Sequence, residues 1–164
     1  MYNRFYLDPH ITPELAGTRL NYNFRGKRLT ISLDSGRYSV SDKQFKITAN
    51  ASFGFNTVKD QLCYFNGNSS AVSLQVKSTT SLTIDIQNWN SDKLAWIQNS
   101  GKSTPQLLNY LVYQLKLKPN TYYSFFVGSK LVKRLKSNLD GELVIGYHPK
   151  AVIEQISIRN ETTL

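Results

Sequence analysis

Leu117-Lys118-Pro119-Asn120-Thr121-Tyr122-Tyr123 is the stretch of this 164-residue chain that decides its fold. Leu, Pro, Thr and Tyr alternate through it at every second position. Proline fixes its own φ and has no N–H to donate, so Pro119 ends a strand. A tyrosine at the start of the next strand can bury its ring and return its hydroxyl to the backbone, as in the tyrosine corner of β-sandwiches. We therefore expect Tyr123 to mark a corner between two strands of a sandwich.

Composition favours the same class of fold along the rest of the chain. Hydrophobic residues make up 40% and aromatic residues 12%, with ten tyrosines among the latter. Aromatic and β-branched residues suit pleated, half-exposed strands better than helices. Short alternating apolar runs recur throughout the sequence, whereas no helical period persists. The sequence predicts an all-β protein, an antiparallel β-sandwich of the fibronectin III/immunoglobulin-like kind.

Two turns have clear sequence signals. Alternating apolar residues over 20–24 and 29–33 flank the Arg-Gly-Lys-Arg sequence at 25–28, in which Gly26 tolerates positive φ. This pattern predicts a hairpin. Asn138-Leu139-Asp140-Gly141 predicts a second tight turn, before a strand over 143–147.

The polar run Asn66-Gly67-Asn68-Ser69-Ser70 is the best candidate for a domain boundary. It divides the chain into an N-terminal β-hairpin subdomain, residues 1–66, and a β-sandwich with the tyrosine corner, residues 67–164.

Two pieces of the sequence resemble known families. The corner at 117–123, the Gly128-Ser129-Lys130 turn and the Asp140-Gly141 turn resemble a fibronectin type III-like module. More narrowly, residues 72–158 look like the β-sandwich accessory modules of bacterial carbohydrate-active enzymes. Residues 9–40, with Tyr-Asn-Phe-Arg-Gly at 22–26, are similar to the C-terminal β-domain of maltose-phosphorylase-type glycoside hydrolases. The catalytic carboxylates of those enzymes lie on a separate helical barrel, so both resemblances imply an accessory module, which is not the enzyme itself.

Residues for catalysis have no recognisable pattern. Most acidic residues fall in turns, where hydrogen bonding to the backbone explains them. The two histidines, His10 and His148, are far apart and each adjoins a proline, with no ligand-spaced partner. Nucleotide-binding and nucleophile-elbow motifs are absent from the sequence. We expect no enzyme activity, no cofactor and no metal site.

A glycan site is expected around Trp89. Sugar rings stack on aromatic side chains through their C–H faces, and amides bind their hydroxyls. Trp89 stands between Asn88 and Asn90, and Tyr110 is a further aromatic candidate. The alternative for Trp89 is a core position across the sandwich. The expected partner is a glycan or a neighbouring catalytic domain.

Two other functions remain open. One is a protein-interaction or structural module of a surface, phage or virion assembly, using sheet edges. The other is single-stranded nucleic-acid binding, since the formal charge is +9 and Lys130, Arg134 and Lys136 would share one face of a regular strand. Solvated lysines on an edge strand explain the same residues.

The lone Cys63 forms no disulfide within the chain and lies among apolar residues, as expected of a buried, unreactive thiol. The first residues have no signal-peptide character, and no run reaches transmembrane length. The compartment stays open, and would be extracellular or at the cell surface if the chain belongs to a secreted enzyme.

Overall fold

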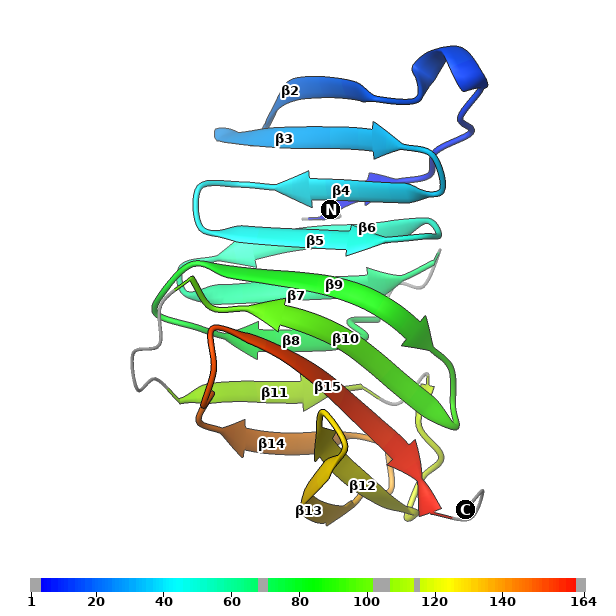
Figure 1. Ribbon diagram of the computed structural model, residues 1–164, viewed down its shortest axis with the longest axis vertical. Helices are drawn as coiled ribbons and strands as arrows, with labels where there is room; N and C mark the ends of the chain where they lie inside the picture. Colours follow the sequence, from blue (N-terminus) through cyan, green and yellow to red (C-terminus); the bar gives the residue numbers. More distant parts are fainter. Residues whose placement is uncertain (1–3, 68–70, 102–106, 114–115, 162–164) are drawn as a thin grey trace.

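The computed structural model describes residues 4–67, 71–101, 107–113 and 116–161. These residues form two β-sheets, of six and nine strands, that face each other along the long axis of the molecule (Figure 1). They include a short 3-10 turn, η1 (Pro13–Leu15), and no α-helix. The predicted all-β class is confirmed, and the two mostly antiparallel sheets are consistent with a β-sandwich.

Strands from distant parts of the chain lie side by side in both sheets. In order across it, the six-stranded sheet consists of β1 (Phe5–Leu7), β6 (Phe53–Val58), β7 (Gln61–Asn66), β8 (Leu74–Lys77), β11 (Leu108–Val112) and β14 (Leu143–Tyr147). The nine-stranded sheet consists, listed in the opposite direction along the molecule (Figure 1), of β13 (Lys130–Lys136), β12 (Tyr122–Val127), β15 (Ile153–Asn160), β10 (Lys93–Asn99), β9 (Leu82–Trp89), β5 (Phe45–Ala49), β4 (Arg37–Ser41), β3 (Lys27–Asp34) and β2 (Thr18–Phe24).

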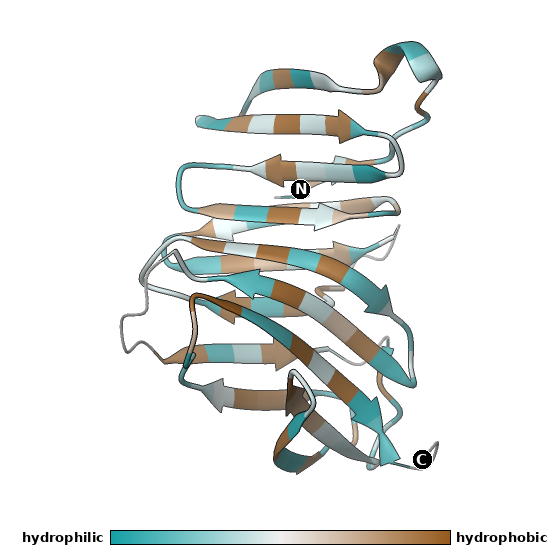
Figure 2. Ribbon diagram, in the orientation of Figure 1, coloured by the Kyte–Doolittle hydropathy of each residue, from teal (hydrophilic) through white to brown (hydrophobic). Residues whose placement is uncertain are grey.

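The core lies between the sheets and is built from alternate residues of the strands. In β9, Leu82, Ile84 and Ile86 are buried, while the residues between them are half-exposed. Successive side chains of a strand point to opposite faces, so this alternation turns one face of each sheet toward the other. Figure 2 shows the same banding of apolar and polar residues along most strands. The buried residues form one cluster that contains Trp96 and Phe125.

The predicted hairpin at residues 20–33 is confirmed as β2 and β3, which pair in antiparallel register from Thr18 and Leu33 to Phe24 and Lys27. Its two-residue turn has positive φ at Arg25 (50°) and at Gly26 (76°). Positive φ at both central residues defines a type I′ turn, whose twist matches that of the strands.

The backbone hydrogen bond predicted for Tyr123 is confirmed, whereas Pro119 does not end a strand, because β11 already ends at Val112. Tyr123 is only 1% exposed, and its hydroxyl accepts a hydrogen bond of 2.8 Å from the backbone N–H of Lys118. The same hydroxyl donates to the carbonyl of Ser91 at 3.4 Å. The corner thus connects the start of β12 to two separate loops.

The turn at Asn138–Gly141 also forms, but it does not make a hairpin. Asn138 accepts at its side-chain oxygen from the N–H groups of Asp140 (2.9 Å) and Glu142 (2.8 Å), and Gly141 has a φ of 72°. The strands that it joins lie in different sheets, β13 in the nine-stranded sheet and β14 in the six-stranded one. The asparagine turn therefore carries the chain across the sandwich.

Strands from both sides of the predicted boundary pair within both sheets. β7 pairs with β8 in antiparallel fashion, and β5 pairs with β9 in the one parallel ladder of the described residues. Residues 68–70 of the proposed boundary lie outside the part of the chain that the structure describes. The division into units at 1–66 and 67–164 stays a prediction.

Candidate functional site

Three of the four predicted ligand-binding residues lie together. Asn88, Trp89 and Asn90 line a hollow of about 300 Å³ that we call the Trp89 hollow. It lies where β5, β7 and β9 end, at the same end of both sheets. Its other lining residues are Ala49, Asn50, Ala51, Tyr64, Asn66, Ile86 and Gln87.

The indole of Trp89 is half-buried and belongs both to the core and to the hollow. Its ring meets Tyr64 edge-on, with centroids 5.1 Å apart, and lies 6.2 Å from the ring of Trp96. The indole N–H is buried and has no acceptor among the described residues. Buried donors are nearly always paired, so an unpaired one requires an explanation, such as water or a ligand. The N–H is thus an unpaired donor beneath the surface of the hollow, and an acceptor reaches it only if the side chains around it move.

Some amide groups of the hollow hold the surrounding loop in place, and others keep a donor that a ligand could use. Asn90 shapes the loop, because its side-chain oxygen accepts from the N–H groups of Asp92 (3.0 Å) and Lys93 (2.8 Å). Its amide nitrogen donates to Oδ1 of Asn88 at 2.9 Å, which turns the Asn88 amide nitrogen outward as a donor. Asn66 is held in the same way, since the hydroxyl of Tyr64 donates to its Oδ1 at 3.0 Å.

None of the described residues that line the Trp89 hollow is charged. Its polar side-chain groups are amides, which both donate and accept, together with the Tyr64 hydroxyl and one indole N–H. Such a lining suits a neutral ligand with many hydroxyls better than an ion, because a buried ion needs an opposite charge or several hydrogen bonds.

Tyr110, the fourth predicted residue, is not part of the hollow. It lies in β11 with 0% exposure, and its hydroxyl donates to Oε1 of Gln98 at 2.5 Å. Burial raises the pKa of its hydroxyl. Alternation in β11 points Tyr110 into the core, so no ligand at the surface reaches it.

The predicted basic face is divided by a β-bulge. The register between β12 and β13 shifts where Val132 has no partner of its own. An extra residue reverses the alternation of the strand. Lys130 is consequently opposite Val127, on the side that packs on the core, whereas Arg134 and Lys136 lie on the outer side. The three residues do not form one stripe.

The two basic residues that do share a face have local partners. Arg134 donates to Glu161 at 2.6 Å, and Lys136 lies 5.4 Å from the ring centroid of Tyr122. Hydrogen bonds from the Ser124 hydroxyl and from Arg134 lower the pKa of the Glu161 carboxyl. An acidic group within this face weakens its attraction for a polyanion.

The described residues contain no group of three His, Cys, Asp or Glu side chains that could hold a metal ion. No helix in the same part of the chain combines the length and the apolar character needed to cross a membrane.

Glu154 is a buried carboxylate, and its two oxygens accept from Tyr147, Gln98 and the backbone of residues 150 and 151. These donors explain how the sandwich accommodates it.

Comparison with known proteins found no match. No family model, no curated protein and no solved structure matches the chain significantly.

Sequence reasoning missed four polar or aromatic residues of the hollow. Asn50, Tyr64, Asn66 and Gln87 come from three segments that meet only because β5 pairs with β9 and β7 packs across from them. Only Gln87 adjoins the predicted residues, and its position next to Asn88 is the one signal that could have found it.

Proposed function

We propose that the chain is a non-catalytic, carbohydrate-associated β-sandwich module that binds a neutral glycan in the Trp89 hollow. In this proposal it belongs with the fibronectin type III-like accessory modules that its sequence resembles, and its partner is a glycan or a neighbouring glycoside-active domain. The observation that carries the proposal is the buried indole N–H of Trp89, which lacks an acceptor among the described residues in a hollow lined by amides.

The binding mechanism uses the two properties of a sugar ring. Its C–H face packs on the exposed part of the Trp89 indole, and a hydroxyl accepts a hydrogen bond from the indole N–H once the side chains that cover this buried group move aside. The amide nitrogens of Asn88 and Asn66 donate to further hydroxyls, while Gln87 and Asn50 at the rim are exposed and free to turn. Small ligands are typically bound by such a mixture of apolar surface and a few fixed polar groups.

The test is binding to an array of neutral oligosaccharides that includes maltohexaose and cellohexaose, followed by calorimetry on the best of them. Trp89→Phe keeps an aromatic ring and removes the N–H, and Asn88→Ala removes a donor from an exposed position. Loss of one hydrogen bond is expected to weaken binding up to about 10-fold in either variant. Asn23→Ala, an exposed amide at the opposite end of the sheet, is the matched control and leaves binding unchanged. A blank array, or affinity unaffected by both variants, contradicts the proposal.

A protein-interaction role is the second candidate, and the edge strand β2 favours it. Leu20 and Tyr22 are 48% and 51% exposed on an unpaired edge of the nine-stranded sheet. Exposed edges of this kind pair with strands of other chains. Small-angle scattering that reveals a symmetric oligomer, abolished by Tyr22→Lys, would favour this role, and a monomer at all concentrations would count against self-assembly.

A further inference from the structure

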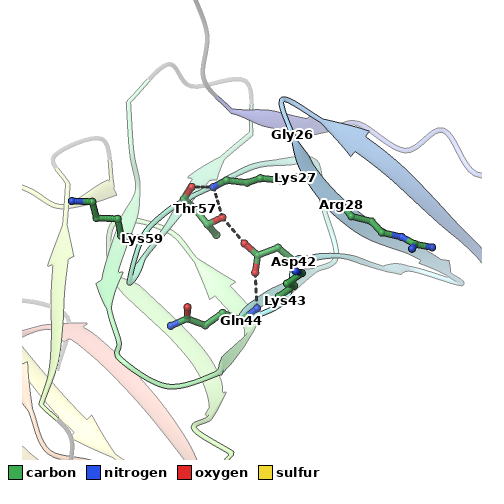
Figure 3. Close-up of a pocket in the computed structure, with 8 residues that line it drawn as sticks. All are labelled: Gly26, Lys27, Arg28, Asp42, Lys43, Gln44, Thr57 and Lys59. Atoms are coloured by element: carbon green, nitrogen blue, oxygen red, sulfur yellow. Dashed lines mark hydrogen bonds between the residues drawn. The ribbon is translucent and has the colours of Figure 1, made fainter.

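A second hollow lies at the opposite end of the sandwich from Trp89, and basic residues surround it. We call it the basic pocket (Figure 3). Three turns converge there, those that join β2 to β3, β4 to β5 and β6 to β7. Its volume is about 330 Å³, and its lining residues are Gly26, Lys27, Arg28, Asp42, Lys43, Gln44, Thr57 and Lys59.

Four cations and one carboxylate line the basic pocket. The carboxylate belongs to Asp42 and is already occupied: Oδ1 accepts from the N–H groups of Gln44 (2.9 Å) and Phe45 (2.8 Å), and Oδ2 accepts from the hydroxyl of Thr57 (2.5 Å). Among the described residues, no carboxylate forms an ion pair with Arg28, Lys43 or Lys59. The pocket therefore keeps a surplus of positive charge.

Lys27 is the fixed cation of this pocket. Its ammonium donates to Oγ1 of Thr57 at 2.9 Å and also to the carbonyl oxygen of Thr57. Asp42 holds the Thr57 hydroxyl from the other side, so a chain of three side chains fixes the ammonium in place (Figure 3). An ammonium has three donors, so one remains for a ligand.

The other three cations lie at the rim. Arg28 and Lys59 extend away from the pocket in opposite directions, and Lys43 lies on the turn between β4 and β5 (Figure 3). All three are exposed and come from different turns. To contact an anion beside Lys27, the side chains of Arg28 and Lys59 must turn from the directions that they take in Figure 3.

At this end of the molecule, basic residues occupy two backbone positions whose positive φ does not suit long side chains. Only three described residues other than glycine have positive φ, and two of them are basic: Lys59 (53°), which lines the pocket, and Arg25 (50°), in the hairpin turn beside it. Glycine and asparagine fit such positions without the steric penalty that a long side chain incurs. Strained positions are concentrated at functional sites.

We propose that the basic pocket binds a tetrahedral oxyanion, a phosphate or sulfate group. Lys27 makes the fixed contact from within the pocket, and Arg28, Lys43 and Lys59 close over the anion from the three turns. Lysine ammonium groups bind phosphate as point charges, and the guanidinium fork of arginine matches phosphate geometry as well. This site is independent of the glycan proposal, because the two hollows lie at opposite ends of the strands.

The test is a titration of the protein with inorganic phosphate and, separately, with inorganic sulfate at constant ionic strength, followed by the backbone amide signals in NMR. We expect saturable shifts at Gly26, Lys43, Gln44 and Lys59, and none with chloride at equal ionic strength. The triple variant Arg28→Gln, Lys43→Gln, Lys59→Asn should bind at least about 10-fold more weakly, with asparagine chosen at 59 because it tolerates positive φ. The control Lys93→Gln, Lys130→Gln, Lys133→Gln carries the same net charge, alters exposed lysines elsewhere and should bind as the parent does.

Glucose 6-phosphate and glucose 6-sulfate separate the two sources of the anion. If the sugar esters bind with the same affinity as inorganic phosphate or sulfate, the natural ligand is a free anion. If they bind more tightly, the anion is a substituent on a larger ligand. Both results support the site. The proposal is overturned if no shift saturates below about 50 mM, which corresponds to a binding free energy weaker than about 2 kcal/mol. It is also overturned if both triple variants weaken binding equally, since net charge alone then explains the effect. Arg28→Gln by itself, at an exposed position, keeps the test valid if the triple variant fails to fold.

Discussion

Tyr123 links the hydrophobic core to the loop that precedes β12 through two parts of one side chain. The ring is buried and its cluster extends to Phe125, while the hydroxyl pairs with the Lys118 N–H and the Ser91 carbonyl. Partial burial raises the pKa of the hydroxyl, which therefore stays protonated as a donor at ordinary pH.

Tyr123→Phe should lower the free energy of unfolding by about 1–3 kcal/mol, because the ring is kept and the N–H of Lys118 loses its acceptor. Urea denaturation measures the change. The neighbouring Tyr122 is the matched control: it is 55% exposed, and removal of its hydroxyl should change stability by less than about 0.5 kcal/mol. Equal losses in the two variants would show that the corner hydrogen bond does not stabilise the fold.

Cys63 gives the protein a pH dependence in the alkaline range. Burial in β7 raises the pKa of its thiol from 9.0 to about 11. A pKa raised in the folded state contributes stability that is complete below pH 9 and is lost as the pH rises through about 11.

Between about pH 8 and about pH 10.5 the thiol should therefore account for a loss of about 2 kcal/mol in the free energy of unfolding, at about 1.4 kcal/mol per pKa unit. Urea denaturation across this range checks the slope, and Cys63→Ala, which lacks the thiol, should lose about 2 kcal/mol less than the parent. The loss that remains in the variant comes from buried tyrosines, whose hydroxyl pKa is also raised by burial. A variant that loses stability over this range as steeply as the parent would rule out the thiol as the cause.

At the scale of the elements, the sequence predicts what neighbouring residues decide. The alternation over 20–33 and the Arg-Gly dipeptide specify the β2–β3 hairpin, because the paired residues are close in the chain and turn chemistry sets the register. The corner at Tyr123 is predictable for the same reason. The turn at 138–141 is recognisable too, but whether it closes a hairpin or crosses between sheets depends on where β13 and β14 find partners far along the chain.

Long-range pairing and irregular register limit what the sequence can reveal of the site. The parallel pairing of β5 with β9 brings Asn50 beside Trp89, and no local pattern indicates it. The bulge at Val132 moves Lys130 off the face of Arg134, because one extra residue reverses a period of two. A basic turn is visible at residues 25–28, yet its convergence with Lys43 and Lys59 follows from three separate turns at one end of the strands.

At the scale of the whole molecule, the two halves of the chain share one core. The buried cluster includes Leu29 and Ile47 from the first half and Trp96 and Ile158 from the second. β9 has β5 as one of its two neighbours, and β8 has β7. Residues 67–164 alone would expose the edges and the apolar faces that these strands cover.

The full chain should accordingly unfold in one cooperative transition, since neither half can keep its buried surface without the other. Each half carries its own reporter: the tryptophans, Trp89 and Trp96, lie in the second half, and Cys63 is the only cysteine and lies in the first. We expect the urea midpoint from tryptophan fluorescence to coincide with the midpoint from pulse labelling of Cys63, which is 8% exposed in the native state. Labelling well below the fluorescence midpoint would mean that residues 1–66 open as a separate subdomain. Coincident midpoints, together with failure of a 67–164 fragment to give a cooperative transition, would establish that the two halves of the chain fold as one unit.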